Sequence, residues 1–61
     1  MNDEEKILKT LKDFGRLATW RIAAIIGRNP KATEKILNKL LDEKKIKQIK
    51  ETVSTYWELP K

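Results

Sequence analysis

The sequence predicts an α+β domain in which three helices are followed by a C-terminal β-hairpin. Apolar residues recur at helical spacing in three stretches, and after Lys44 two short β-prone runs flank a short loop. The glycines and prolines, which interrupt regular structure, all lie at boundaries between these stretches: Gly15, Gly27, Pro30 and Pro60. With 61 residues, the chain is expected to form one domain over residues 1–61 around one modest core.

The first helix is predicted over residues 2–14. Asn2 can serve as its N-cap, and Glu5, three positions later, completes a capping-box pattern. Acidic residues fill the first turn, where the helix dipole favours negative charge. Gly15 is placed to end the helix in the left-handed conformation. The helix should bury the apolar residues that share one face: Ile7, Leu8, Leu11 and Phe14.

Two further helices are predicted around a tight turn. Residues 16–18 form a short connector that allows a strand fragment, and Thr19 is the expected N-cap of a helix over residues 20–26, which Gly27 ends. Asn29 is the expected cap of the third helix, with Pro30 at its first position, and this helix runs to about Lys44. Their predicted core faces are Ile22, Ala23 and Ile26, then Thr33, Ile36, Leu37, Leu40 and Leu41.

A hairpin is predicted from residues 46–50 and 55–59 with a loop over 51–54. Trp57 shares one strand face with Leu59, so it is expected to pack the hairpin onto the core. The spacing of Ile46 and Ile49 departs from strict alternation and allows a β-bulge there. Pro60 should end the second strand.

This order of elements resembles the winged helix-turn-helix DNA-binding superfamily, in which the hairpin is the wing. The likeness rests on residues 7–15, 22–27 and 40–46, leading into Tyr-Trp-Glu-Leu at 56–59. It implies that the third helix lies in the major groove and that the wing contacts the backbone or minor groove. That superfamily often has glycine between the third helix and the wing, where this chain has Lys44 or Lys45.

Composition narrows the functional classes. The formal net charge is +5, and a basic small domain favours nucleic acid or an anionic membrane surface as partner, although heat-adapted proteins also carry lysine-rich solvated surfaces. No apolar run approaches the roughly 18 residues of a membrane span, so no membrane partner is expected. Histidine and cysteine are absent, which removes the usual general base and the commonest zinc ligands. The sequence therefore predicts neither an enzyme nor a cofactor.

The expected DNA contacts lie on the third helix. At about 100° per residue, Lys31, Lys35, Asn38 and Lys39 fall opposite the leucine stripe. Lysines neutralise phosphates, and asparagine can bond bidentately to adenine. The alternative is that these residues form an ordinary solvated helix face. Further candidates around this helix are Arg28, Trp20, Arg21, Lys47, Lys50, Thr52, Ser54 and Thr55. Local packing explains Trp20 equally well, and a solvent-exposed polar hairpin explains the last five.

A narrower resemblance is to the Z-alpha domains, which bind left-handed nucleic acid. The layout and the Tyr-Trp-Glu-Leu ending carry it, and Lys31 and Lys35 match basic positions. Those domains use an asparagine and a tyrosine one turn apart on the third helix, where this chain has Glu34 and Asn38. They also have prolines before the wing tryptophan, where Ser54 and Thr55 stand here.

The predicted function is binding of double-stranded DNA, as a small transcriptional regulator in the cytoplasm associated with the nucleoid. The alternative is a protein–protein interaction module, since a fold does not fix a function and the third helix also carries Glu34 and Asp42. A homodimer is left open, formed through the first helix or the exposed edge of the hairpin.

Overall fold

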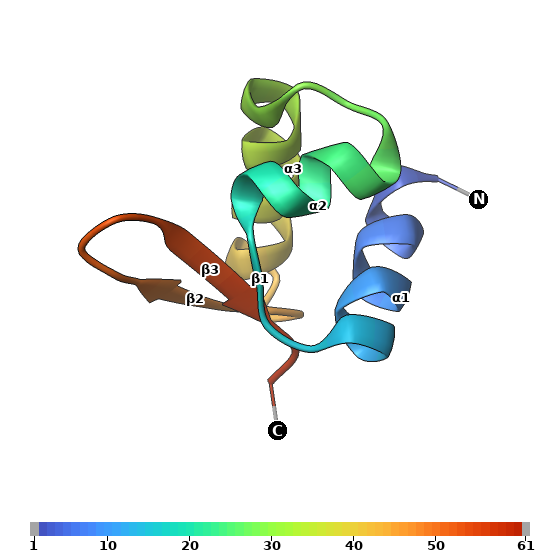
Figure 1. The fold of residues 1–61 in the computed structure, drawn as a ribbon. Helices are drawn as coiled ribbons and strands as arrows, with labels where there is room; N and C mark the ends of the chain where they lie inside the picture. The colour runs from blue at the N-terminus through green and yellow to red at the C-terminus, as the bar shows by residue number, and fades with distance from the viewer. Residues whose placement is uncertain (1, 61) are drawn as a thin grey trace.

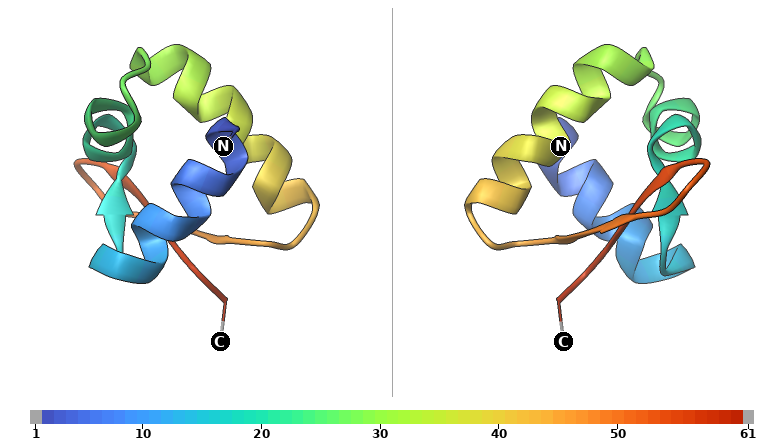
Figure 2. Two further views of the ribbon diagram at one scale, coloured as in Figure 1. Left: turned by 90° about the vertical axis from the view of Figure 1, so that its right-hand side faces the viewer. Right: turned by 90° about the vertical axis from the view of Figure 1, so that its left-hand side faces the viewer.

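The computed structural model describes residues 2–60 as three helices packed with a small antiparallel sheet. The elements are α1 (Asp3–Phe14), β1 (Leu17–Ala18), α2 (Thr19–Ile26), α3 (Pro30–Asp42), β2 (Lys47–Lys50) and β3 (Thr55–Glu58). The sheet order is β1-β3-β2, and the β2–β3 hairpin projects to one side of the helices (Figure 1). In the turned views α2 is seen almost end-on while α3 runs steeply across the molecule (Figure 2). The predicted α+β architecture of three helices and a hairpin is confirmed.

The start of α1 is capped as predicted, but its end differs. The Asn2 side-chain oxygen accepts a hydrogen bond from the Glu5 N–H at 2.8 Å. Gly15 has φ +80° and ψ −141°, so its φ is positive but its ψ lies outside the left-handed helical region. This backbone geometry is essentially restricted to glycine. The prediction of a left-handed cap is therefore wrong, although glycine is required there.

The predicted N-cap of α2 is also wrong. Ala18 occupies the cap position without any side-chain hydrogen bond, and Thr19 is the first helical residue. The Thr19 hydroxyl instead accepts a hydrogen bond from the Trp57 indole N–H at 2.7 Å and donates one to the Thr55 carbonyl at 3.4 Å. A buried indole N–H requires an acceptor. Thr19 therefore ties the start of α2 to the hairpin. Gly27, with φ +75° and ψ 33°, ends α2 in the predicted left-handed conformation.

The third helix begins as predicted and ends about two residues early. The Asn29 side chain accepts a hydrogen bond from the Ala32 N–H at 2.7 Å, and Pro30 is the first helical residue. After Asp42 the chain turns through Lys44, whose φ is +62°. The N–H groups of Lys44 and Lys45 close the helix on the carbonyls of Leu41 and Leu40, each at 2.9 Å. This Schellman pattern usually has glycine where Lys44 stands.

The hairpin is regular. Its register runs without interruption from Lys47 opposite Glu58 to Lys50 opposite Thr55, so the bulge that the sequence allowed is not formed. The spacing of Ile46 and Ile49 has a simpler cause, because Ile46 precedes β2 and is buried in the core.

One core joins all three helices to the hairpin. Trp57 is 1 % exposed, which confirms that it packs the hairpin onto the helices. Phe14 was predicted to be buried but is 66 % exposed, because it lies at the very end of α1, beyond the part of the helix that the other elements cover. Thr33 is fully buried, and its hydroxyl has no hydrogen-bond partner among residues 2–60. The buried cluster comprises Ile7, Leu11, Ile22, Ile26, Leu37, Leu40, Ile46 and Trp57.

Candidate nucleic-acid interface

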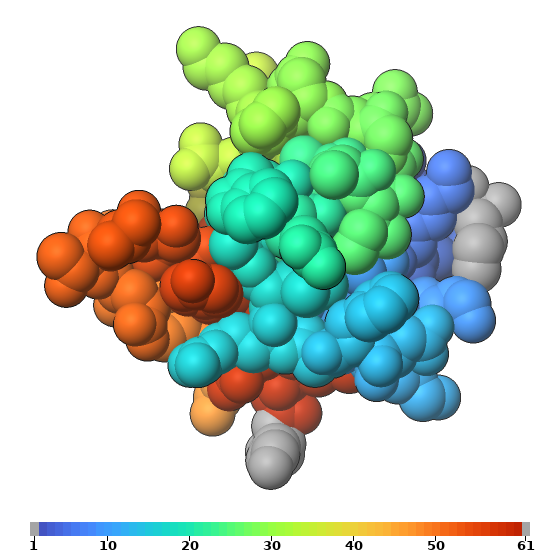
Figure 3. Space-filling model, in the orientation of Figure 1, coloured from blue at the N-terminus to red at the C-terminus, as the bar shows by residue number. Residues whose placement is uncertain are grey.

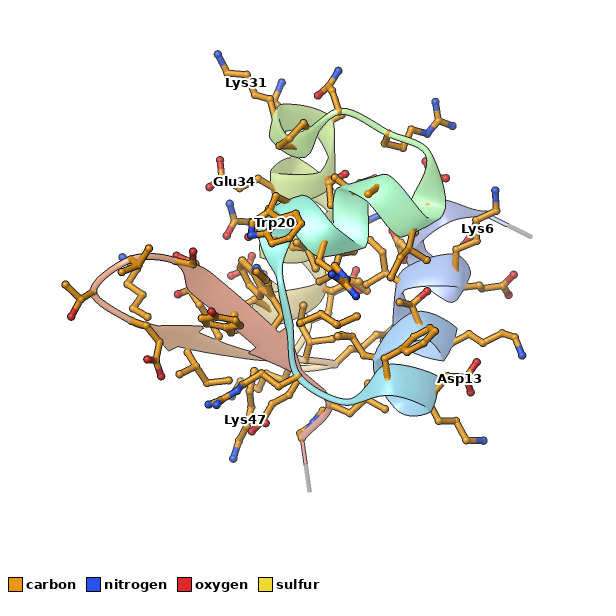
Figure 4. All side chains as sticks on the ribbon, in the orientation of Figure 1. Lys6, Asp13, Trp20, Lys31, Glu34 and Lys47 are labelled. Atoms are coloured by element: carbon orange, nitrogen blue, oxygen red, sulfur yellow. The ribbon has the colours of Figure 1, made fainter. Side chains whose placement is uncertain are left out.

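The side of α3 turned away from the core is polar and exposed. Thr33, Leu37 and Leu40 are buried on one side of the helix, which leaves the opposite side to solvent. We call this exposed surface the outer face of α3, formed by Lys31, Glu34, Lys35 and Asn38. Lys31 and Glu34 project from α3 on the side of the molecule where the start of α2 and the hairpin lie (Figure 4).

The charged side chains of the outer face have no ion-pair partner in the part of the chain that the structure describes. Within residues 2–60, neither lysine nor Glu34 forms an ion pair. The Asn38 side chain likewise takes part in none of the hydrogen bonds formed by that part of the chain. These groups are therefore free to bind a ligand without first giving up an internal contact.

Lys39 and Arg28 are placed differently, because acids of α1 neutralise both. The Lys39 ammonium lies 2.8 Å from the Glu4 carboxylate. Their hydrogen bond raises the pKa of Lys39 and lowers that of Glu4. The Arg28 Nε donates to the Asp3 carboxylate at 3.0 Å. The sequence-predicted site thus has two parts. Within residues 2–60, the outer face forms no ion pair, whereas the cations of the margin next to α1 are paired with acids.

The candidate residues of the hairpin also fall into two groups, by their exposure and by their position along the hairpin. Lys50 and Thr52 are exposed at the loop end, whereas Ser54 and Thr55 are half-buried. Lys47 pairs with Glu58 at the other end of the hairpin, and Figure 4 places it well away from Lys31. The space-filling outline is concave between α3 and the hairpin loop (Figure 3). The exposed candidates Lys50 and Thr52 therefore lie at the loop end of the hairpin, whereas Lys47 lies apart from Lys31 and Glu34.

Trp20 and Arg21 lie at the start of α2. The Trp20 side chain is 58 % exposed, so local packing does not account for it fully. The Arg21 guanidinium carbon lies 5.9 Å from the centre of the Trp20 ring. Sequence reasoning missed two neighbours of this pair, Arg16 and Tyr56, which line the same small hollow. The signal for Tyr56 was available, since strand alternation places it on the face of β3 opposite Trp57.

Two structural features are absent from residues 2–60, a cluster of metal-ligating side chains and a membrane-spanning helix. Residues 2–60 contain no cluster of acidic, histidine or cysteine side chains able to hold a metal ion. In that part of the chain, no helix combines the length and apolar character needed to cross a bilayer.

Comparison with solved structures identifies the fold as a winged helix-turn-helix. No protein-family model and no curated protein sequence matches the chain. The Zalpha domain of PKZ from Carassius auratus, in complex with Z-DNA, superposes with a TM-score of 0.87 at 24 % identity, covering 95 % of this chain and 92 % of that one. A variant of ZitR from Lactococcus lactis, in complex with DNA, gives a TM-score of 0.88 at 26 % identity. A MarR family transcriptional regulator from Silicibacter pomeroyi gives 0.89 at 16 % identity.

The length of the match differs between these neighbours. The chain spans 43 % of the ZitR chain and 42 % of the Silicibacter regulator, although 100 % and 98 % of its own residues are covered. The chain therefore corresponds to the winged-helix portion of those regulators.

Proposed function

We propose that this protein binds double-stranded DNA through the outer face of α3, with the loop end of the hairpin beside the DNA backbone, and that it catalyses no reaction. The observation that carries the proposal is a pair of lysines, Lys31 and Lys35, that form no ion pair within residues 2–60 and lie on a face that adjoins the concave margin between α3 and the hairpin. The ZitR neighbour, whose winged-helix portion the chain matches, is in complex with DNA, which supports the same assignment.

Each group has a definite role in this proposal. The major groove of B-DNA is wide enough to admit an α-helix such as α3. Lys31 and Lys35 neutralise phosphates and release counterions. Asn38 reads adenine through paired hydrogen bonds. Lys50 and Thr52 contact the backbone from the hairpin loop. Arg28 and Lys39 join the interface only when they leave Asp3 and Glu4.

The direct test is fluorescence anisotropy with several labelled duplexes over a series of salt concentrations. We expect binding that weakens steeply as salt rises, because bound lysines displace counterions from the phosphates. Absence of salt-sensitive binding at low ionic strength would refute the proposal. That result would favour the alternative of a protein–protein interaction module.

Base reading by Asn38 has its own test. Asn38→Ala should reduce the difference in affinity between duplexes of different sequence by roughly 5- to 100-fold, the discrimination of one bidentate contact. Gln48→Ala removes an exposed amide on β2 and serves as the matched control. Equal sequence preference in the two variants would remove Asn38 from the base-reading role.

We propose further that DNA binding serves transcriptional regulation, in the cytoplasm and in association with the nucleoid. Several structural neighbours are transcriptional regulators, and the chain corresponds to their winged-helix portion. A homodimer formed through α1 or the free edge of β2 would let two copies read two half-sites. Light scattering with and without a two-site duplex measures the stoichiometry.

Left-handed DNA is the second candidate ligand, favoured by the mutual coverage with the Zalpha domain. The residues argue against it, because Glu34 and Asn38 stand where those domains have asparagine and tyrosine. Circular dichroism of an alternating dC-dG duplex distinguishes the two. We expect the right-handed spectrum to persist when the protein is added, and inversion of the spectrum would establish the second candidate.

A further inference from the structure

A small hollow at the start of α2 combines aromatic rings with guanidinium groups. It lies between β1, the start of α2 and β3, and is lined by Arg16, Leu17, Ala18, Trp20, Arg21 and Tyr56. Ala18 is buried and Leu17 and Tyr56 are half-buried, so they form its floor. Trp20 is exposed at its edge.

Two arginine–aromatic pairs meet in this hollow. The Arg16 guanidinium carbon lies 5.4 Å from the centre of the Tyr56 ring, and that of Arg21 lies 5.9 Å from the centre of the Trp20 ring. Arginine placed over an aromatic face is held there by the ring quadrupole, while its N–H groups stay available to an anion. The Arg16 guanidinium also forms an exposed ion pair with Glu51, in which the nitrogen lies 3.9 Å from the carboxylate oxygen, a separation too long for a hydrogen bond. Both guanidinium groups can therefore reach a phosphate without breaking a strong contact.

The exposed indole is the second requirement for a nucleotide site. An exposed aromatic side chain offers a π-face on which a base can stack, and stacking tolerates any base. A planar anionic ligand matches both features of the hollow, since the ring takes the base and the guanidinium groups take the flanking phosphates. An apolar partner would leave the two arginines without a role.

We propose that this hollow binds an unpaired nucleotide next to the duplex held by α3, with the base stacked on Trp20 and its phosphates on Arg16 and Arg21. The proposal rests on the proposed function, because the strand reaches the hollow from the duplex. Trp20 projects on the side of the molecule on which Glu34 of the outer face lies (Figure 4). A blunt-ended duplex offers no free base, so the protein prefers duplex DNA with a single-stranded extension.

The experiment compares a blunt-ended duplex with the same duplex carrying a short unpaired oligothymidine tail. We expect the tail to raise affinity by roughly 5- to 100-fold, the effect of stacking one base on an aromatic side chain, and to quench the fluorescence of Trp20. The gain should disappear in Trp20→Ala and in Arg16→Gln, and persist in part in Trp20→Phe. Arg16→Gln should leave binding of the blunt duplex close to that of Lys12→Gln, which removes an equal charge from α1. Circular dichroism of each variant checks that it folds.

The outcomes separate this proposal from the proposed function. If the blunt duplex binds and the tail adds nothing, the hollow does not bind a nucleotide while duplex binding stands. A gain that survives Trp20→Ala places the tail elsewhere and overturns the proposal. If no duplex binds, the proposed function fails. In that case, titration with the oligothymidine alone tests whether the hollow binds a nucleotide. Binding that is lost in Trp20→Ala upholds nucleotide binding by the hollow, and no binding overturns it.

Discussion

The two sides of α3 differ in the contacts that their side chains make within the chain. The inner side packs Leu37 and Leu40 against α1, α2 and the hairpin, and its margin pairs Lys39 with Glu4. On the outer face, Lys31 and Lys35 have no carboxylate partner within residues 2–60. The inner side is therefore determined by contacts within the chain, and the outer face is left available to a ligand. Substitutions on the inner side should change stability, and those on the outer face should change affinity.

The largest effect is expected on the outer face. Lys31→Gln combined with Lys35→Gln should lower affinity for any duplex about 50-fold at moderate salt, because each lost phosphate contact removes about 0.9 from the salt slope. Stability should change by less than about 0.5 kcal/mol, as for other exposed substitutions. Lys6→Gln with Lys12→Gln removes the same charge from α1, and anisotropy compares the two double variants. Equal losses in both would mean that net charge alone drives binding.

On the inner side, a substitution at Thr33 should change stability and leave affinity for DNA unchanged. Thr33→Val removes a buried hydroxyl that has no hydrogen-bond partner within residues 2–60 and keeps the side-chain shape, so the free energy of unfolding should rise by about 1 kcal/mol. DNA affinity should stay unchanged. Thr10→Val is the matched control, because the Thr10 hydroxyl donates to the Lys6 carbonyl at 2.7 Å. Urea denaturation measures both, and a Thr33 variant no more stable than the Thr10 variant would contradict the assignment.

The margin of the inner side should respond in affinity rather than stability. Glu4→Gln releases Lys39 toward the DNA, and we expect affinity to rise roughly fivefold at moderate salt through one additional phosphate contact. Glu5→Gln makes the same change of charge in the same turn, at a residue with no ion pair in the described chain. The two variants should therefore differ, with Glu4→Gln binding more tightly. Identical gains would show that Lys39 stays out of the interface.

The smallest effect is the pH dependence of the same ion pair. The folded pKa of Glu4 is lowered from its ordinary value of 4.5 by the hydrogen bond from Lys39. Stabilisation by the pair is therefore present above pH 4.5 and is lost as pH falls through the lowered pKa. Melting temperatures of the original chain and of Glu4→Gln should differ slightly near neutral pH and converge in acid. A difference that grows on acidification would reverse the assigned direction.

The fold was predictable from the sequence where local and long-range preferences agree. Asn2, Asn29 and Gly27 act as predicted because a cap depends on its own turn. The prediction that Thr19 is an N-cap failed because its hydroxyl accepts a hydrogen bond from a distant residue, Trp57. The prediction that Phe14 is buried failed because helical periodicity does not show how far along the helix the other elements pack against it. Local rules therefore predicted most element boundaries and missed the contacts between elements.

The candidate site was predictable only in part. A helical projection places Lys31, Lys35 and Asn38 on one exposed face, and the structure agrees. The same projection includes Lys39 and cannot reveal that Glu4, 35 positions earlier, neutralises it. The hollow around Trp20 was not predicted for the same reason, since Arg16 and Tyr56 are distant in sequence and meet only through the pairing of β1 with β3.

The central claim, that DNA lies on the outer face of α3, is tested most directly by NMR titration of the isotope-labelled chain with a blunt duplex. The amides of Lys31, Lys35 and Asn38, and those of the hairpin loop, should show the largest shifts. The amides of α1 should move least. Largest shifts along α1, with those of α3 unchanged, would contradict the account.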